Sequence, residues 1–172
     1  SHQAATAEMC CVCFDAIIGR LNNEKPAKRR VSYDKQQCFP LFVTWNKLSS
    51  VDNEYRLRGC IGTFSSNSPL ESTLFDYAIT SAFEDHRFNP ISKSELPKLK
   101  CSVSLLVQFE YAENVYDWTI GVHGIRITFP SDPNNSDSRS LSATYLPDVC
   151  GEQGWTKQEC LQSLYRKAGY KG

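Results

Sequence analysis

The chain has 172 residues, of which 41% are hydrophobic and 12% aromatic, a composition typical of a globular domain with its own core. Its 19 basic residues balance its 19 acidic ones, which argues against a nucleic acid or an anionic membrane as partner. Eight cysteines without a secretion signal indicate reduced thiols of the cytoplasm or nucleus. No apolar run approaches the roughly 20 residues of a membrane span.

The first half of the chain carries signals for a helix, a hairpin and a second helix. Apolar residues recur at three- and four-residue spacing over 6–22 and predict a helix. Extended segments over 40–46 and 56–64 are joined by a polar stretch and predict a hairpin. The string Ser68-Pro-Leu-Glu is typical of a capping box with proline at the first helical position, so a helix should start there and end near Glu84.

The second half carries strand signals and one further helix. Alternating patterns predict three strands, over 100–109, 118–129 and 141–146. The string Thr156-Lys-Gln-Glu is a second capping box, whose helix should end at Ala168 with Gly169 in the C-terminal cap. Strand pairs with helices at both ends and in the middle predict an α+β fold, with a mainly antiparallel sheet flanked by helices.

The most informative segment is Arg58-Gly59-Cys60-Ile61-Gly62. Side chains alternate along a strand, so Arg58 and Cys60 should share one face, where the guanidinium would favour a thiolate and could hold an anion. Glycines inside a strand mark a bulge or the close approach of a ligand or a second backbone. The alternative is a buried packing cysteine in a tight sheet, with Arg58 in a structural ion pair.

A catalytic cysteine needs a neighbouring base, and two histidines are candidates. His86 follows a predicted helix end and lies between Asp85 and Arg87. The alternative is that Asp85 and Arg87 fix the loop while His86 is exposed to solvent. His123 falls on the predicted core side of its strand, which favours a partly buried histidine over a catalytic one.

Two other kinds of site receive little support. Cys10 and Cys13 have zinc-knuckle spacing, but no second ligand pair completes four ligands, and both fall on the apolar stripe of the first helix. Gly59-x-x-Gly62 lacks the spacing and the Lys-Ser/Thr ending of a phosphate loop. We therefore expect no metal and no cofactor.

The string Leu57-Arg-Gly-Cys-Ile-Gly62 resembles the signature hexapeptide of the AMMECR domain family. Other blocks match the family in the same order: Pro40–Trp45, Asp85–Phe88, Glu95–Pro97, Cys101–Leu106, Gly121–Ile125, Thr144–Pro147, Glu152–Trp155 and Arg166–Tyr170. The string Cys10–Asp15 resembles the animal branch. The resemblance implies a larger sheet-and-helix lobe with a smaller lobe, and a single domain over 6–172. Because family members usually continue past Tyr170, it also implies a shortened C-terminal end.

Residues 1–5 are expected to be an expression remnant or disordered. The family has no settled reaction, although some members are fused to Memo-like and radical-SAM domains. We therefore keep two functions. In the first, a small-molecule-binding or enzymatic cleft is centred on the strand 58–62, with Cys60 and His86 as catalytic candidates and with a ligand-binding set made of Arg58, Gly59, Gly62, Asp85 and Arg87. In the second, the chain is a non-catalytic interaction module that binds a protein. In both, we expect an intracellular monomer.

Overall fold

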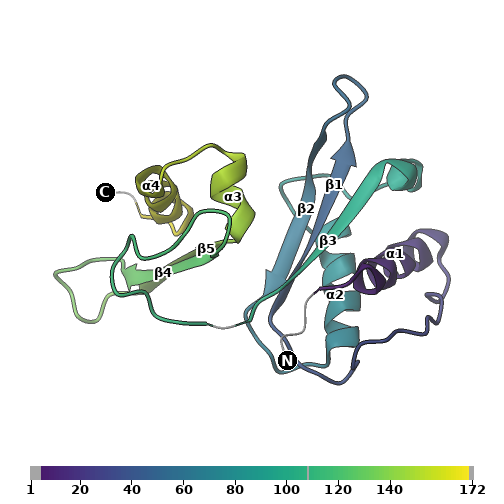
Figure 1. Cartoon of the computed structure of the whole chain (residues 1–172), viewed down its shortest axis with the longest axis horizontal. Helices are drawn as coiled ribbons and strands as arrows, with labels where there is room; N and C mark the ends of the chain where they lie inside the picture. Colours follow the sequence, from purple (N-terminus) through teal and green to yellow (C-terminus); the bar gives the residue numbers. More distant parts are fainter. Residues whose placement is uncertain (1–4, 108, 171–172) are drawn as a thin grey trace. The chain divides into compact units, whose positions relative to one another are not determined.

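The computed structural model describes residues 5–107 and 109–170 and divides the chain into two compact units, one up to Phe109 and one from Glu110 (Figure 1). The first unit contains α1 (Ala7–Asn22), β1 (Leu41–Leu48), β2 (Tyr55–Thr63), α2 (Leu70–Phe83), the 3-10 helix η1 (Lys93–Lys98) and β3 (Leu99–Leu105). The second, smaller unit contains β4 (Ile125–Pro130), β5 (Ser140–Tyr145), α3 (Pro147–Glu152) and α4 (Lys157–Lys167). The α+β fold with mainly antiparallel sheet is thereby confirmed. The expectation for residues 1–5 falls outside the described residues except at residue 5.

The first unit is a three-stranded antiparallel sheet, ordered β2-β1-β3, with both long helices on one face (Figure 1). Trp45 of β1 shows why the helices lie there. Its buried ring meets Phe14 of α1 edge to face, with ring centroids 4.9 Å apart, and its Nε1 donates to the Ala78 carbonyl of α2 at 3.2 Å. One residue of the central strand therefore ties both helices to the sheet.

The helix starts differ from the expected pattern at α2. The predicted capping box does not form, because the N-cap is Pro69 and no side chain caps the helix. The loop before it supplies the partner, as Leu70 N donates to Gln37 O at 2.7 Å. A capping box forms instead at η1, between Ser92 and Glu95. The first helix ends at Asn22, as predicted, with Asn23 in the left-handed conformation.

The second unit combines the β4–β5 hairpin with α3 and α4. The capping box between Thr156 and Glu159 forms as predicted, and Gly169 follows the helix with a φ of 93°. The expectation that all cysteines are reduced is wrong here, because Cys150 and Cys160 are joined by a disulfide. Their Cα atoms are 6.0 Å apart, a separation that a bridge can span.

The predicted strand over 118–129 is wrong in its first half. Residues before Ile125 form turns, in which Val122 N and His123 N both donate to Thr119 O. His123 is consequently exposed rather than partly buried, and its Nδ1 accepts from Thr119 N at 2.9 Å. In the described parts of both units, no helix is long and apolar enough to cross a membrane.

Candidate functional site

A β-bulge decides which way the side chains of β2 point. Trp45 pairs with Gly59, whereas the next residue of β1, Asn46, pairs with Leu57, so Arg58 is the extra residue. Cys60 pairs with Thr44, whose side chain lies on the sheet face opposite to Trp45 and the helices. Arg58 and Lys47 both donate to Glu95, and Lys47 lies on the Trp45 face of the sheet. The Arg58 side chain therefore points toward that face. The prediction that Arg58 and Cys60 share a face is therefore wrong.

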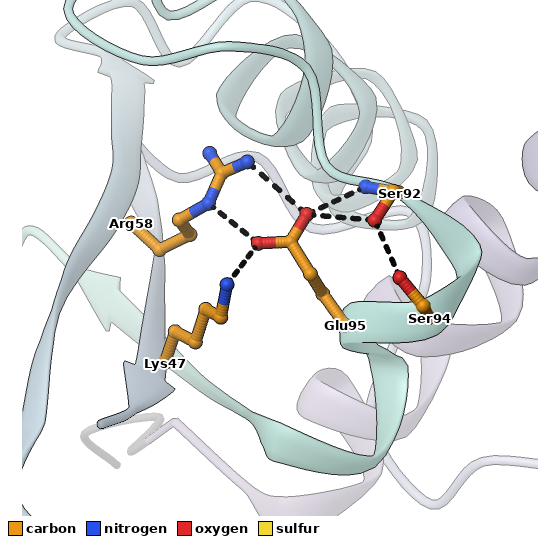
Figure 2. A network of polar contacts seen from close by, with 5 residues as sticks. All are labelled: Lys47, Arg58, Ser92, Ser94 and Glu95. Atoms are coloured by element: carbon orange, nitrogen blue, oxygen red, sulfur yellow. Dashed lines mark hydrogen bonds and ion pairs between the residues drawn. The ribbon is translucent and has the colours of Figure 1, made fainter. Parts of the chain in front are cut away.

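Arg58 belongs to a compact ion-pair network centred on Glu95. Figure 2 shows Lys47 and Arg58 pointing from neighbouring strands toward this carboxylate. Arg58 donates from Nε at 3.0 Å and from Nη2 at 3.3 Å, and Lys47 Nζ donates at 2.7 Å. Ser92 adds its N–H at 2.8 Å and its hydroxyl at 3.1 Å. Burial by itself would raise the pKa of Glu95, but these hydrogen bonds outweigh it and lower the pKa to about 2.

A second ion pair holds the free edge of β2 at Cys60. The Asp85 carboxylate, 6% exposed, accepts from Cys60 N at 3.0 Å and from Arg87 Nη2 at 2.7 Å. Arg87 Nη2 also donates to Cys60 O at 3.3 Å. The hydrogen bonds from Arg87, followed by the one from Cys60 N, outweigh burial and lower the pKa of Asp85 to about 2. The pair thus occupies both backbone groups of Cys60, as a neighbouring strand would.

The Cys60 thiol is half-buried and has a hydroxyl and a guanidinium among its neighbours. Thr44 Oγ1 donates to Cys60 Sγ at 3.1 Å, as expected for side chains at a closely spaced, non-hydrogen-bonded pair of strand residues. The Arg87 guanidinium interacts electrostatically with Cys60. The cation beside this thiol is therefore Arg87, which is 58% exposed, and not Arg58 as the alternation of the sequence suggested.

The two glycines allow close packing of the backbone. A Cβ built on Gly59 would overlap the carbonyl oxygen of Ser81 in α2, and one built on Gly62 would overlap Leu41 O and Phe42. Gly59 is buried, so α2 already occupies the space on its side of the strand. The sequence offered a bulge or a close approach as the reason for glycine, and Gly59 shows both, because it follows the bulged Arg58 and packs against the Ser81 carbonyl of α2.

The remaining candidates contribute less to this site. His86 is exposed, in the turn that follows α2, while Asp85 and Arg87 fix that turn to β2. His123 belongs to the second unit. Cys10 and Cys13 are free thiols on α1; Cys13 is buried and Cys10 partly buried. Within the residues that the structure describes, no group of three or more histidine, cysteine or acidic side chains could hold a metal ion.

Sequence reasoning missed four residues that the structure places at these two clusters. They are Thr44, Lys47, Ser92 and Glu95. The string Ser92-Lys-Ser-Glu95 is a capping-box pattern that could have indicated the last two, whereas the contacts of Thr44 and Lys47 depend on how separate elements meet in the fold. The alternation of buried residues along β1 puts Thr44 on the opposite face from Trp45, but the sequence alone does not say which face the helices cover.

Comparison with known proteins gives the family. The AMMECR1 family model matches residues 10–172. An uncharacterized protein of Arabidopsis thaliana is 47% identical over 172 residues, covering 98% of this chain and 75% of its own length. An uncharacterized protein of Schizosaccharomyces pombe is 39% identical over 165 residues, covering 96% and 81%.

A solved structure agrees with this relationship. The crystal structure of an uncharacterized protein from Pyrococcus horikoshii superposes with a TM-score of 0.75 at 27% identity, over 94% of this chain and 78% of the other. The family model spans nearly the whole chain, and the plant relative is close in sequence over nearly all of it. The chain therefore belongs to the AMMECR1 family.

Proposed function

We propose that the chain is a small-molecule-binding or enzymatic domain whose functional group is the Cys60 thiolate. The observation that carries the proposal is the contact of Thr44 Oγ1 with Cys60 Sγ at 3.1 Å, beside the Arg87 guanidinium. A hydroxyl donor and a cation both stabilise a negative sulfur, which is the nucleophilic and ligand-binding form of cysteine. Arg87 takes the role of the cationic neighbour, and Asp85 holds it in place.

The other predicted residues receive narrower roles in this proposal. Gly59 and Gly62 bring β2 close to α2 and β1 and so position Cys60. Arg58 positions η1 through Glu95 and is not proposed as an anion-binding group. His86 remains a candidate base, with its side chain exposed to solvent in the turn that carries Asp85 and Arg87.

The proposal is tested by the rate of alkylation of Cys60 in the folded protein. Brief exposure to iodoacetamide at several pH values, followed by mass-spectrometric mapping, gives an apparent pKa for each thiol. Exposed Cys38 is the internal reference for an ordinary thiol and buried Cys13 for a protected one. Cys60 should react faster than Cys38 near neutral pH, since more of it is thiolate.

Matched variants separate the two stabilising neighbours. Thr44→Val removes the hydroxyl at nearly constant volume and should slow labelling of Cys60, whereas Thr44→Ser keeps the donor and should not. Arg87→Met should slow it and Arg87→Lys should retain most of the rate, while Arg58→Met should leave it unchanged. Native Cys60 that labels no faster than Cys13 would refute the proposal.

The second candidate is a non-catalytic interaction module, and the hydrogen bonds of Arg87 favour it. The guanidinium donates to the Asp85 carboxylate and to the Cys60 carbonyl. These bonds fix the surface at the edge of β2, which is a structural role. A protected Cys60 in the alkylation experiment would make this the leading function, with a protein as the partner.

Two finer predictions remain open. Assignment to the animal branch rests on the string Cys10–Asp15 alone, since the relatives described above come from a plant, a yeast and an archaeon. Location in the cytoplasm or nucleus remains a prediction from the cysteine usage of the chain, and the Cys150–Cys160 disulfide weighs against it.

A further inference from the structure

The second unit has a small core, and its disulfide is part of that core. The unit covers residues 110–172, and its sheet consists of β4 and β5. A domain of roughly 60 residues buries only about 60% of the surface that its unfolded chain exposes, and a two-stranded hairpin is at best marginally stable by itself. The buried cluster of the unit is formed by Cys150, Cys160 and Trp118. The two bridged cysteines are therefore two of the three side chains in this cluster.

The bridge joins two helices that otherwise share few anchors. It links Cys150 of α3 to Cys160 of α4. Cys150 is the buried residue of the six-residue helix α3, so its sulfur is the main attachment of that helix to the core. Without the bridge, α3 is held by weaker contacts, such as the hydrogen bond from Gly121 N to Pro147 O at 3.2 Å.

The bridge contributes enough to decide whether a small unit is folded. The two cysteines are 10 residues apart in the sequence. A cross-link that closes a loop of this length constrains the unfolded chain and favours the folded state by roughly a hundredfold. A unit with a marginal core that loses such a factor shifts markedly toward its unfolded state.

Disulfide formation is selective within this chain. Cys10 of α1 and Cys101 of β3 hydrogen-bond to each other through their side chains, yet both remain thiols. This hydrogen bond and burial raise the pKa of the Cys10 thiol, so it stays protonated near neutral pH and is a poor partner in thiol–disulfide exchange. A reductant therefore acts on the second unit and leaves this pair of the first unit unchanged.

The bridge is buried but lies next to an exposed turn. Cys150 is 2% exposed and Cys160 0%. The segment 151–154, which leads from α3 toward α4, is exposed, and Gly154 has a φ of 66°. Local opening of this short surface turn gives a reductant access to the sulfur of Cys150 without unfolding of the first unit.

From these observations we propose that the Cys150–Cys160 bridge is a redox switch for the second unit, which a dithiol unfolds by reduction while the first unit stays folded. One thiolate of the dithiol attacks a bridge sulfur, and the other cysteine leaves as a thiolate that takes up a proton. The second dithiol sulfur then displaces the first cysteine, so that two electrons pass to the bridge and the dithiol becomes a cyclic disulfide. The switch is independent of Cys60, which belongs to the first unit.

The test is hydrogen exchange of the native chain with and without dithiothreitol, read by mass spectrometry. Alkylation of a parallel sample shows whether Cys150 and Cys160 are reduced. We expect reduction to speed exchange in peptides of β5 and α4 at least about a hundredfold and to leave peptides of β1 unchanged. Oxidised glutathione should restore protection after the dithiothreitol is removed, whereas a sample alkylated while reduced should not recover.

Variants assign the response to this bridge. Cys150→Ala together with Cys160→Ala should exchange fast in the second unit without reductant and should not respond to it, whereas Cys38→Ser should respond as the native chain does. Three results would overturn the proposal. They are unchanged exchange of β5 and α4 in the reduced chain, a bridge that dithiothreitol does not reduce in the folded protein, and an equal acceleration in β1.

Discussion

Replacement of Glu95 by Gln should destabilise the first unit strongly, because one carboxylate serves two cations. Glu95 is 13% exposed and Arg58 14%, while Lys47 is 38% exposed. The neutral amide leaves the Arg58 guanidinium without an anion, and its Nη1 is already buried without a hydrogen-bond partner among the described residues. Removal of one partner from a buried pair costs about 3–5 kcal/mol, so we expect about 3 kcal/mol here.

The pKa of Glu95 gives a second route to the magnitude. Lowering it from the ordinary 4.5 to about 2 corresponds to about 3 kcal/mol of stability. Because the folded-state pKa is the lower one, this stability is fully present above pH 4.5 and is lost as the pH falls toward 2. The difference between native protein and Glu95→Gln should therefore shrink to about 1.5 kcal/mol at pH 3.

The assay must report on the first unit alone, since the chain has two compact units. Hydrogen exchange at increasing urea, read by mass spectrometry, follows peptides of β1 separately from those of β4 and β5. The second unit is the internal reference, and Asp52→Asn is the control variant, because its ion pair with Arg56 is exposed and should contribute nothing measurable.

Two results would refute this reasoning. One is a Glu95→Gln variant whose β1 opens at the same urea concentration as the native protein at pH 7. The other is a destabilisation of equal size at pH 7 and pH 3, which would mean that the charge of Glu95 is not what stabilises the fold. An Arg58→Met, Glu95→Gln double variant should lose less than the sum of the single losses, because no charge is then left buried alone.

Three further changes have defined outcomes. Gly59→Val should lower stability by roughly 3 kcal/mol, because its Cβ overlaps Ser81 O; an unchanged thermal midpoint would contradict this. Thr156→Ala should cost about 1 kcal/mol and speed hydrogen exchange in the first turn of α4, with Thr156→Ser as the control. Asp85→Asn should lower the melting midpoint near neutral pH and speed exchange of the Cys60 N–H, which its carboxylate now holds; unchanged exchange would show that this bond contributes little.

Local signals were sufficient where the structure depends on neighbours in the chain. The stripe of apolar residues over 6–22 predicted α1 almost to the residue, since helix hydrogen bonds join residues four apart. The Thr156 box predicted the start of α4 for the same reason. At Ser68 the same kind of string failed, because a carbonyl of the distant Gln37 satisfies the first helical N–H instead.

What the sequence by itself determined, then, is the α+β class and the family resemblance, and it singled out the strand around Cys60 as the candidate site. Which arginine accompanies that cysteine was decided only in the tertiary structure. Alternation placed Arg58 beside Cys60, but pairing with β1 inserts Arg58 as a bulge, turns it toward Glu95 and leaves Arg87 at the thiol. A bulge is a property of two strands and their register, and a pattern read along one strand does not contain it.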